Sequence, residues 1–171
     1  MTDQLPAKVQ AMIGKPLYEE CTEFPIEMGY VYNTCAAVHN GNPLFWDSKV
    51  AAEITGGQIA PPTMLSVWFR PHYWAPGAEG ERKALMTHFD LKELLELPEA
   101  VVAGSETIFG EPVRIGDVLT TRQIVREVGA LKQTKLGTGR FWTIDVETVN
   151  QNGDWVGTDI YTMLGYRKPG Q

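Results

Sequence analysis

Several features that mark specialised classes of protein are scarce or missing in this 171-residue chain. It has two cysteines, Cys21 and Cys35, and no Cys-x-x-Cys pair. That usage fits a reducing compartment and gives no support for a disulfide scaffold or a cysteine-based metal site. No apolar run approaches the roughly 20 residues that a membrane helix needs, and the N-terminus lacks the regions of a secretion signal. We therefore expect a soluble, cytoplasmic protein that does not insert into membranes.

Positive charge is also in short supply, since the formal net charge is −6 at pH 7. An acidic balance argues against a nucleic-acid-binding surface. The histidines show no metal-ligand spacing, so we expect neither a metal nor a cofactor. The length is sufficient for one domain with a sizeable core, and we expect a single domain over residues 1–171.

The first half of the chain carries helical patterns. Apolar residues recur at three- and four-residue steps over 25–40, which predicts a helix that opens at Pro25 and ends at Gly41 in a left-handed C-cap. Shorter helices are expected over 47–56 and 91–97.

The run Pro61–Phe69 is apolar almost all round, which is typical of a buried helix. Alternating, β-branched and aromatic residues follow it and predict strands at 101–109, 118–128, 141–149 and 155–166. Asn152-Gly153 is a strong hairpin signal between the last two. Helices followed by antiparallel strands predict the α+β class. A buried central helix at 61–69 wrapped by the sheet would make it a hotdog fold.

Three segments carry a family resemblance: Gly41-Asn42-Pro43-Leu44-Phe45-Trp46-Asp47, Ile59-Ala60-Pro61-Pro62-Thr63, and the stretch from Gly104-Ser105-Glu106 to Ile115-Gly116-Asp117. They resemble the MaoC-like, R-specific enoyl-CoA hydratases and 3-hydroxyacyl dehydratases, most closely the FAS1-like N-terminal half of two-part members. The resemblance implies a hotdog fold, hydro-lyase chemistry, and a coenzyme A or acyl carrier protein thioester as substrate. Local positive charge for the coenzyme A phosphates could come from Arg82-Lys83 or from Arg140.

In the catalytic members of that family, an Asp and a His five residues apart handle protons and water. Asn40 and Phe45 occupy these two positions here. An amide cannot exchange a proton usefully and a phenyl ring has none to exchange, so we expect no catalytic residue in the motif. Its residues could instead contact substrate, with Thr63 as the first possible N–H donor after the two prolines. The candidate substrate-binding residues are Asn40, Asn42, Pro43, Phe45, Trp46 and Thr63.

Each candidate also has a purely structural interpretation. Asn40 and Asn42 are common turn residues, Phe45 and Trp46 could be core or pocket wall, and Thr63 could be a helix cap.

Three functions remain open from the sequence. The chain could be the non-catalytic, pocket-forming half of a heteromeric enoyl-CoA hydratase, with a MaoC-like partner that has an intact Asp/His pair. Such a half would suit a bulky acyl group from fatty acid or steroid metabolism. It could instead be a non-enzymatic scaffold that binds acyl thioesters, or a homodimeric hydratase with a relocated base such as His39.

Overall fold

The computed structural model describes residues 3–70, 76–77 and 84–170. Its centre is one antiparallel sheet in the order β1-β3-β5-β6-β2, with the short β4 paired to β5. The strands are β1 (Pro16–Cys21), β2 (Glu99–Phe109), β3 (Thr120–Val128), β4 (Lys132–Gln133), β5 (Thr138–Val149) and β6 (Trp155–Arg167). The helices are α1 (Ala7–Met12), α2 (Met28–Ala37), α3 (Pro43–Trp46), α4 (Ser48–Thr55), the 3-10 helix η1 (Pro62–Val67) and α5 (Met86–Leu94). The predicted α+β class with an antiparallel sheet is confirmed.

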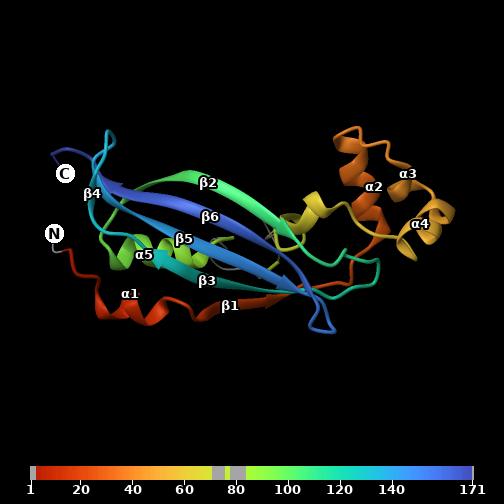
Figure 1. The fold of residues 1–171 in the computed structure, drawn as a ribbon, viewed down its shortest axis with the longest axis horizontal. Coiled ribbons are helices and arrows are strands. Elements are labelled where there is room, and N and C mark those ends of the chain that lie inside the picture. The colour runs from red at the N-terminus through yellow and green to blue at the C-terminus, as the bar shows by residue number, and fades with distance from the viewer. Residues whose placement is uncertain (1–2, 71–75, 78–83, 171) are drawn as a thin grey trace.

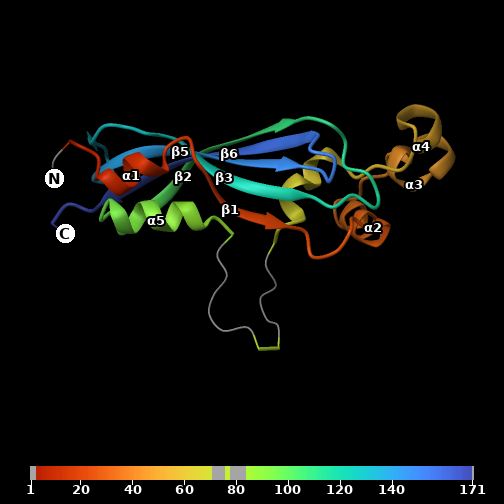
Figure 2. The same ribbon diagram turned by 90° about the horizontal axis from the view of Figure 1, so that it is seen from below.

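The helices gather at two ends of the sheet. α1 and α5 lie along one face, toward the end that carries both termini (Figures 1 and 2). α2, α3 and α4 lie beyond the opposite end, and η1 contacts β6 near that end. In the parts of the chain that the structure describes, no helix is both long and apolar enough to cross a bilayer.

The four predicted strands are present, and the predicted hairpin joins β5 to β6. Gly153 adopts a positive φ of 83° there, and the Asn150 side chain accepts hydrogen bonds from the main-chain N–H groups of Asn152 and Asp154. β1 was not predicted from the sequence. It is a short edge strand with all but one of its residues exposed, so it carries no apolar alternation that would reveal it.

Two hydrophobic clusters correspond to the two groups of helices. The first lies between α2, α3, η1 and the nearby end of the sheet and includes Ile26, Val31, Cys35, Phe45, Ile59, Met64, Leu65, Val113, Leu119 and Val156. The second lies between α1, α5 and the sheet and includes Val9, Leu91, Leu95, Leu97, Val125, Trp142, Ile144 and Met163.

A helix is present within the expected range 61–69, but it is shorter than expected, is a 3-10 helix, and is not the main helix on the sheet. The run forms only the six-residue η1, in which Met64 and Leu65 are buried while Trp68 and Phe69, just after it, are half-buried. Two prolines precede its third residue, and Pro71 disfavours helical backbone at Arg70. The longer helix on the sheet face is α5, which buries Thr87, His88 and Leu91. It begins five residues earlier than the helix expected at 91–97.

The first main helix is also shorter than expected at both ends. α2 begins at Met28 because Ile26 is held outside it, in hydrogen bonds with the main chain of Gly116 and Asp117. It ends at Ala37, and the left-handed residue is His39, at φ 53°, rather than Gly41. α4 ends at Thr55 and is capped, as expected, by Gly56, whose φ is 70°.

Candidate functional site

The motif that resembles the hydratase signature forms the connection from α2 to α4 (Figure 1). Asn40 begins a tight turn in this connection. Its side-chain Oδ1 accepts a hydrogen bond of 3.1 Å from the Asn42 main-chain N–H. Its carbonyl oxygen accepts one of 2.7 Å from Nε1 of Trp46. The Asn40 carboxamide oxygen is therefore used to shape the turn.

Asn42 and Pro43 start the next helix. Asn42 is the N-cap of α3, and its Oδ1 accepts a hydrogen bond of 3.0 Å from the Leu44 main-chain N–H. Pro43 occupies the first turn, where its missing N–H costs nothing. Both residues are exposed, so their local roles leave their outer surfaces accessible.

Phe45 and Trp46 point in different directions. Phe45 is only 6% exposed and belongs to the first hydrophobic cluster. Trp46 is 42% exposed and stacks on Tyr32, with ring centroids 4.9 Å apart. The position that holds the catalytic His in the resembling family is thus filled here by a core side chain, while the next residue has an accessible aromatic face.

Thr63 lies in the first turn of η1 and is exposed. The first hydrogen bond of this turn runs from Met64 N to Pro61 O, at 2.9 Å. Met64 and Phe45 belong to the same cluster, which brings η1 and the motif segment together. The six candidate residues therefore come from two neighbouring segments.

The other titratable candidates lie elsewhere. His39 is exposed at the end of α2. His88 is 7% exposed on α5, where burial and nearby Lys92 lower its pKa. His72, Arg82 and Lys83 lie outside the described residues. Among those described, no three His, Cys, Asp or Glu side chains are arranged to hold a metal ion.

Arg140 has a structural role. It is 5% exposed, donates to the main-chain oxygens of Gly129 and Asp3, and forms an ion pair with the Asp3 carboxylate at 3.6 Å. Its guanidinium holds the N-terminal segment against the sheet and is not presented to solvent phosphates.

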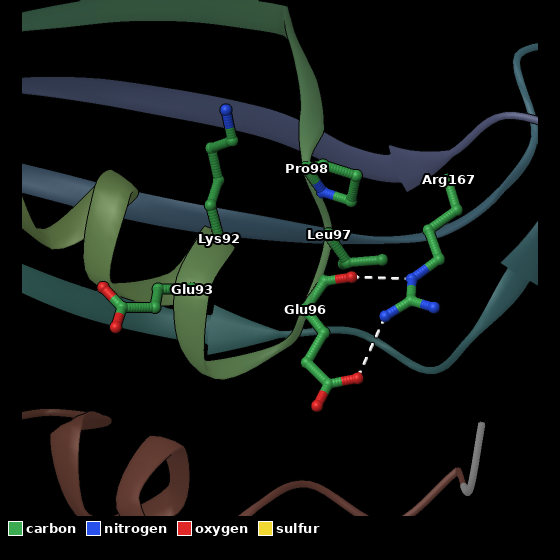
Figure 3. A pocket seen from close by; sticks show the side chains of 6 residues that line it. All are labelled: Lys92, Glu93, Glu96, Leu97, Pro98 and Arg167. Carbon is green, nitrogen blue, oxygen red and sulfur yellow. Dashed lines mark hydrogen bonds and ion pairs between the residues drawn. The ribbon is translucent and has the colours of Figure 1, made fainter. Parts of the chain in front are cut away.

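A hollow of about 390 Å³ lies far from the motif, at the end of the sheet where α5 runs into β2. Figure 3 shows Arg167 across it, donating from Nε to the Glu96 main-chain oxygen and forming an ion pair with the Glu96 carboxylate at 2.9 Å. Its remaining walls are Lys92, Glu93, Leu97 and Pro98. Because Arg167 and Glu96 already pair with each other and the hollow lies far from the motif, we do not place the acyl site here.

Sequence reasoning missed one partly buried polar pair, Thr107 on β2 and Asp159 on β6. The hydroxyl of Thr107 donates a hydrogen bond of 2.6 Å to Asp159, which is 7% exposed. The signal was available in the sequence, because an aspartate in the middle of an otherwise apolar and β-forming run is unusual.

Comparison with known proteins places this geometry in a family. Residues 11–159 match the model of the FAS1-like dehydratase domain region. A probable enoyl-CoA hydratase alpha subunit from Thermomonospora curvata is 28% identical over 170 residues, which are 94% of this chain and 51% of that protein. The chain thus spans about half the length of this curated relative.

Solved structures show the same fold. The ChsH1-ChsH2 complex from Mycobacterium tuberculosis contains a chain that is 21% identical, with a TM-score of 0.78 over 96% of this chain and 90% of that one. R-hydratase PhaJ1 from Pseudomonas aeruginosa is 20% identical, with a TM-score of 0.54 over 91% of this chain and 83% of that one. The hotdog fold is thereby confirmed, and the chain belongs to the family of FAS1-like dehydratase domains.

Proposed function

We propose that this chain is the non-catalytic, pocket-forming half of a heteromeric enoyl-CoA hydratase that acts on a bulky acyl group. The proposal rests on the two residues that occupy the family's catalytic positions. Asn40 uses its carboxamide oxygen in a turn, and Phe45 is buried in the core. Hydration of an enoyl thioester requires a base to take a proton from water and an acid to protonate the α-carbon. Neither side chain can do either step.

The partner in this proposal is a MaoC-like chain with an intact Asp/His pair. The names of two similar proteins, an alpha subunit and a member of a two-component complex, support an assembly of this kind. This chain would contribute the pocket wall around Asn42, Trp46 and Thr63, and the partner would supply the proton-handling groups. A coenzyme A thioester would be the substrate, with no further cofactor.

The two edges of the sheet differ in a way that supports a partner at β2. The β1 edge has six residues, a bulge after Leu17, and the charged pair Glu19 and Glu20. Charge, shortness and bulges are the features that protect an edge from pairing.

The β2 edge is less protected, although it also has a register shift, between Val102 and Gly104, and carries Glu99 and Glu106. It is eleven residues long and pairs with β6 on one side only. Its exposed apolar side chains are Val101, Val102, Ile108 and Phe109. A long, apolar, unpaired edge favours antiparallel pairing with a second strand, so we place the partner's own edge strand here.

An assay of the chain alone and with a partner tests the proposal. The partner is taken from a neighbouring gene of the native host that encodes an intact Asp-x-Asn-Pro-Leu-His motif. Hydration of a branched enoyl-CoA should appear only in the mixture, and replacing the partner's Asp by Asn should eliminate it. Asn40→Ala should change the rate of the mixture only mildly. Efficient hydration by the purified chain would reject the non-catalytic role.

A further inference from the structure

A buried carboxylate lies near the middle of the sheet and has no role in the function proposed above. Asp159 is on β6, and its side chain points to the face that η1 and α5 cover. Two neighbours on the same face define this orientation. A Cβ atom at Gly157 would lie 2.7 Å from the Leu65 side chain of η1, and Met163 packs in the cluster around α5. Asp159 therefore lies between the two helices that cover this face.

Among the described residues, the Asp159 carboxylate has one hydrogen-bond partner and no ion-pair partner. Thr107, its cross-strand neighbour, donates one hydrogen bond to Oδ1. None of the ion pairs found among the described residues involves Asp159. A carboxylate that is 7% exposed is costly to bury unless it is paired and fully hydrogen-bonded.

Tyr161 and Ser105 lie on the same face as Asp159 and Thr107, and the four side chains form a polar row across β6 and β2. Tyr161 is half-buried, and its pKa is raised by burial and by the Asp159 charge while Arg70 opposes the shift. Ser105 is directly opposite Tyr161 on β2 and is exposed. The row consequently runs from a buried carboxylate to a solvent-accessible strand edge.

We infer that Asp159, Thr107 and Tyr161 bind a hydroxyl group on the acyl portion of the substrate. The inference rests on the proposed pocket-forming role, since it assigns one wall of that pocket. A carboxylate only accepts hydrogen bonds, and Thr107 occupies one of its oxygens. A substrate hydroxyl can donate to the other oxygen and can accept from the Tyr161 phenol. An oxo group cannot donate, so it would leave the carboxylate unsatisfied. The substrate class is therefore a hydroxylated bulky acyl thioester.

Binding measurements with matched acyl-CoAs test the inference. The probes are ω-hydroxyacyl-CoAs of increasing length, with unsubstituted and ω-oxo acyl-CoAs of the same lengths. They are titrated by calorimetry into the chain alone and into its complex with the partner. At the length that reaches Asp159, the hydroxylated probe should bind about tenfold more tightly than the unsubstituted one, as expected for one hydrogen bond to a charged group.

Two matched variants assign the effect. Asp159→Asn should remove the tenfold advantage, whereas Asp145→Asn, on the opposite face of the neighbouring strand and paired with Arg126, should retain it. Asp159→Asn should also unfold at an unchanged or higher temperature without ligand, because it removes a buried charge that forms none of the ion pairs found among the described residues. A lower unfolding temperature would show that Asp159 is structural and would overturn the inference.

The remaining outcomes separate the inference from the proposed function. Equal affinity for hydroxylated and unsubstituted probes at every length, or preference for the oxo series, would overturn the hydroxyl site and leave the pocket-forming role intact. If no acyl-CoA binds to the chain or to the complex, the pocket-forming role fails and the hydroxyl site fails with it.

Discussion

Trp46 and Asn40 close the turn that carries the altered motif, because the indole N–H of Trp46 donates a hydrogen bond of 2.7 Å to the Asn40 carbonyl oxygen. The same indole stacks on Tyr32 of α2. One side chain thus connects α2, the turn and α3, and it leaves 42% of its surface exposed. In the proposed assembly, that exposed aromatic face forms pocket wall where the catalytic relatives handle a proton.

Trp46→Phe should test the structural part of this relationship. Phenylalanine keeps a stacking ring but loses the N–H donor, so the free energy of unfolding should fall by about 1 kcal/mol. Urea denaturation measures the change. Trp155→Phe is the matched control, because its indole donates only to the nearby Thr158 hydroxyl. Proteolysis near residues 38–47 should become faster in Trp46→Phe but not in Trp155→Phe. Equal rates of proteolysis in both variants would show that the Trp46 hydrogen bond does not stabilise this turn.

Leu91→Ala should show that α5 is the helix on which the core depends. Leu91 is fully buried between α5 and the sheet. Its truncation leaves a cavity and should lower the free energy of unfolding by about 2–5 kcal/mol. Leu136→Ala, at a position 44% exposed, should change it by less than about 0.5 kcal/mol. A small effect at Leu91 would indicate that the segment at 61–69, and not α5, is the helix on which the stability of the core depends.

His88 should make stability depend on pH below neutrality. Burial, with a further contribution from Lys92, lowers the pKa of this histidine below its ordinary value of 6.5. The unfolded chain therefore binds the proton more readily than the folded one. The stability that this group confers is fully present above about pH 6.5 and is lost as pH falls below that value.

Urea denaturation between about pH 7.5 and about pH 5 measures the effect of His88. The loss of stability over this interval should be smaller in His88→Gln than in the wild type. His39→Gln is the control, because His39 is exposed, and its profile should follow that of the wild type. Parallel profiles for His88→Gln and the wild type would contradict the expected titration.

Val102→Lys should weaken assembly with the partner. Val102 is 60% exposed on the unpaired β2 edge, and a lysine there opposes strand pairing. Light scattering of the mixture should show dissociation to the separate chains at concentrations where the wild type stays associated. Leu136→Lys, beyond β4, should assemble normally. Full assembly of Val102→Lys would show that the interface with the partner does not lie at β2.

Strands β2, β3, β5 and β6 could be predicted from the sequence because each combines alternating or β-forming residues with a clear turn. The covering helices could not be positioned in the same way. The run at 61–69 is as apolar as a buried helix, yet its prolines limit it to six helical residues. In α5, the polar residues His88 and Asp90 interrupt the apolar pattern that would have indicated a buried helix face. Tyr18 on β1 donates a hydrogen bond to Asp90, a long-range contact that no local pattern reveals.

The altered motif positions were visible in the sequence because the resemblance fixes their spacing. Their local roles were not visible. Only the structure shows that the Asn40 side chain shapes a turn and that Phe45 belongs to the core. The hydrogen bond between Thr107 and Asp159 joins residues 52 positions apart, so it depends on the register of β2 against β6.

Hydration of a branched enoyl-CoA by the purified chain, followed through loss of the conjugated thioester absorbance, tests the central claim most directly. The account predicts a rate at background, unchanged in His39→Ala, and a rate that rises by at least about 10²-fold when the partner with the intact Asp/His pair is added. Efficient turnover by the chain alone, abolished in His39→Ala, would contradict the account and would identify this chain as a hydratase with a relocated base.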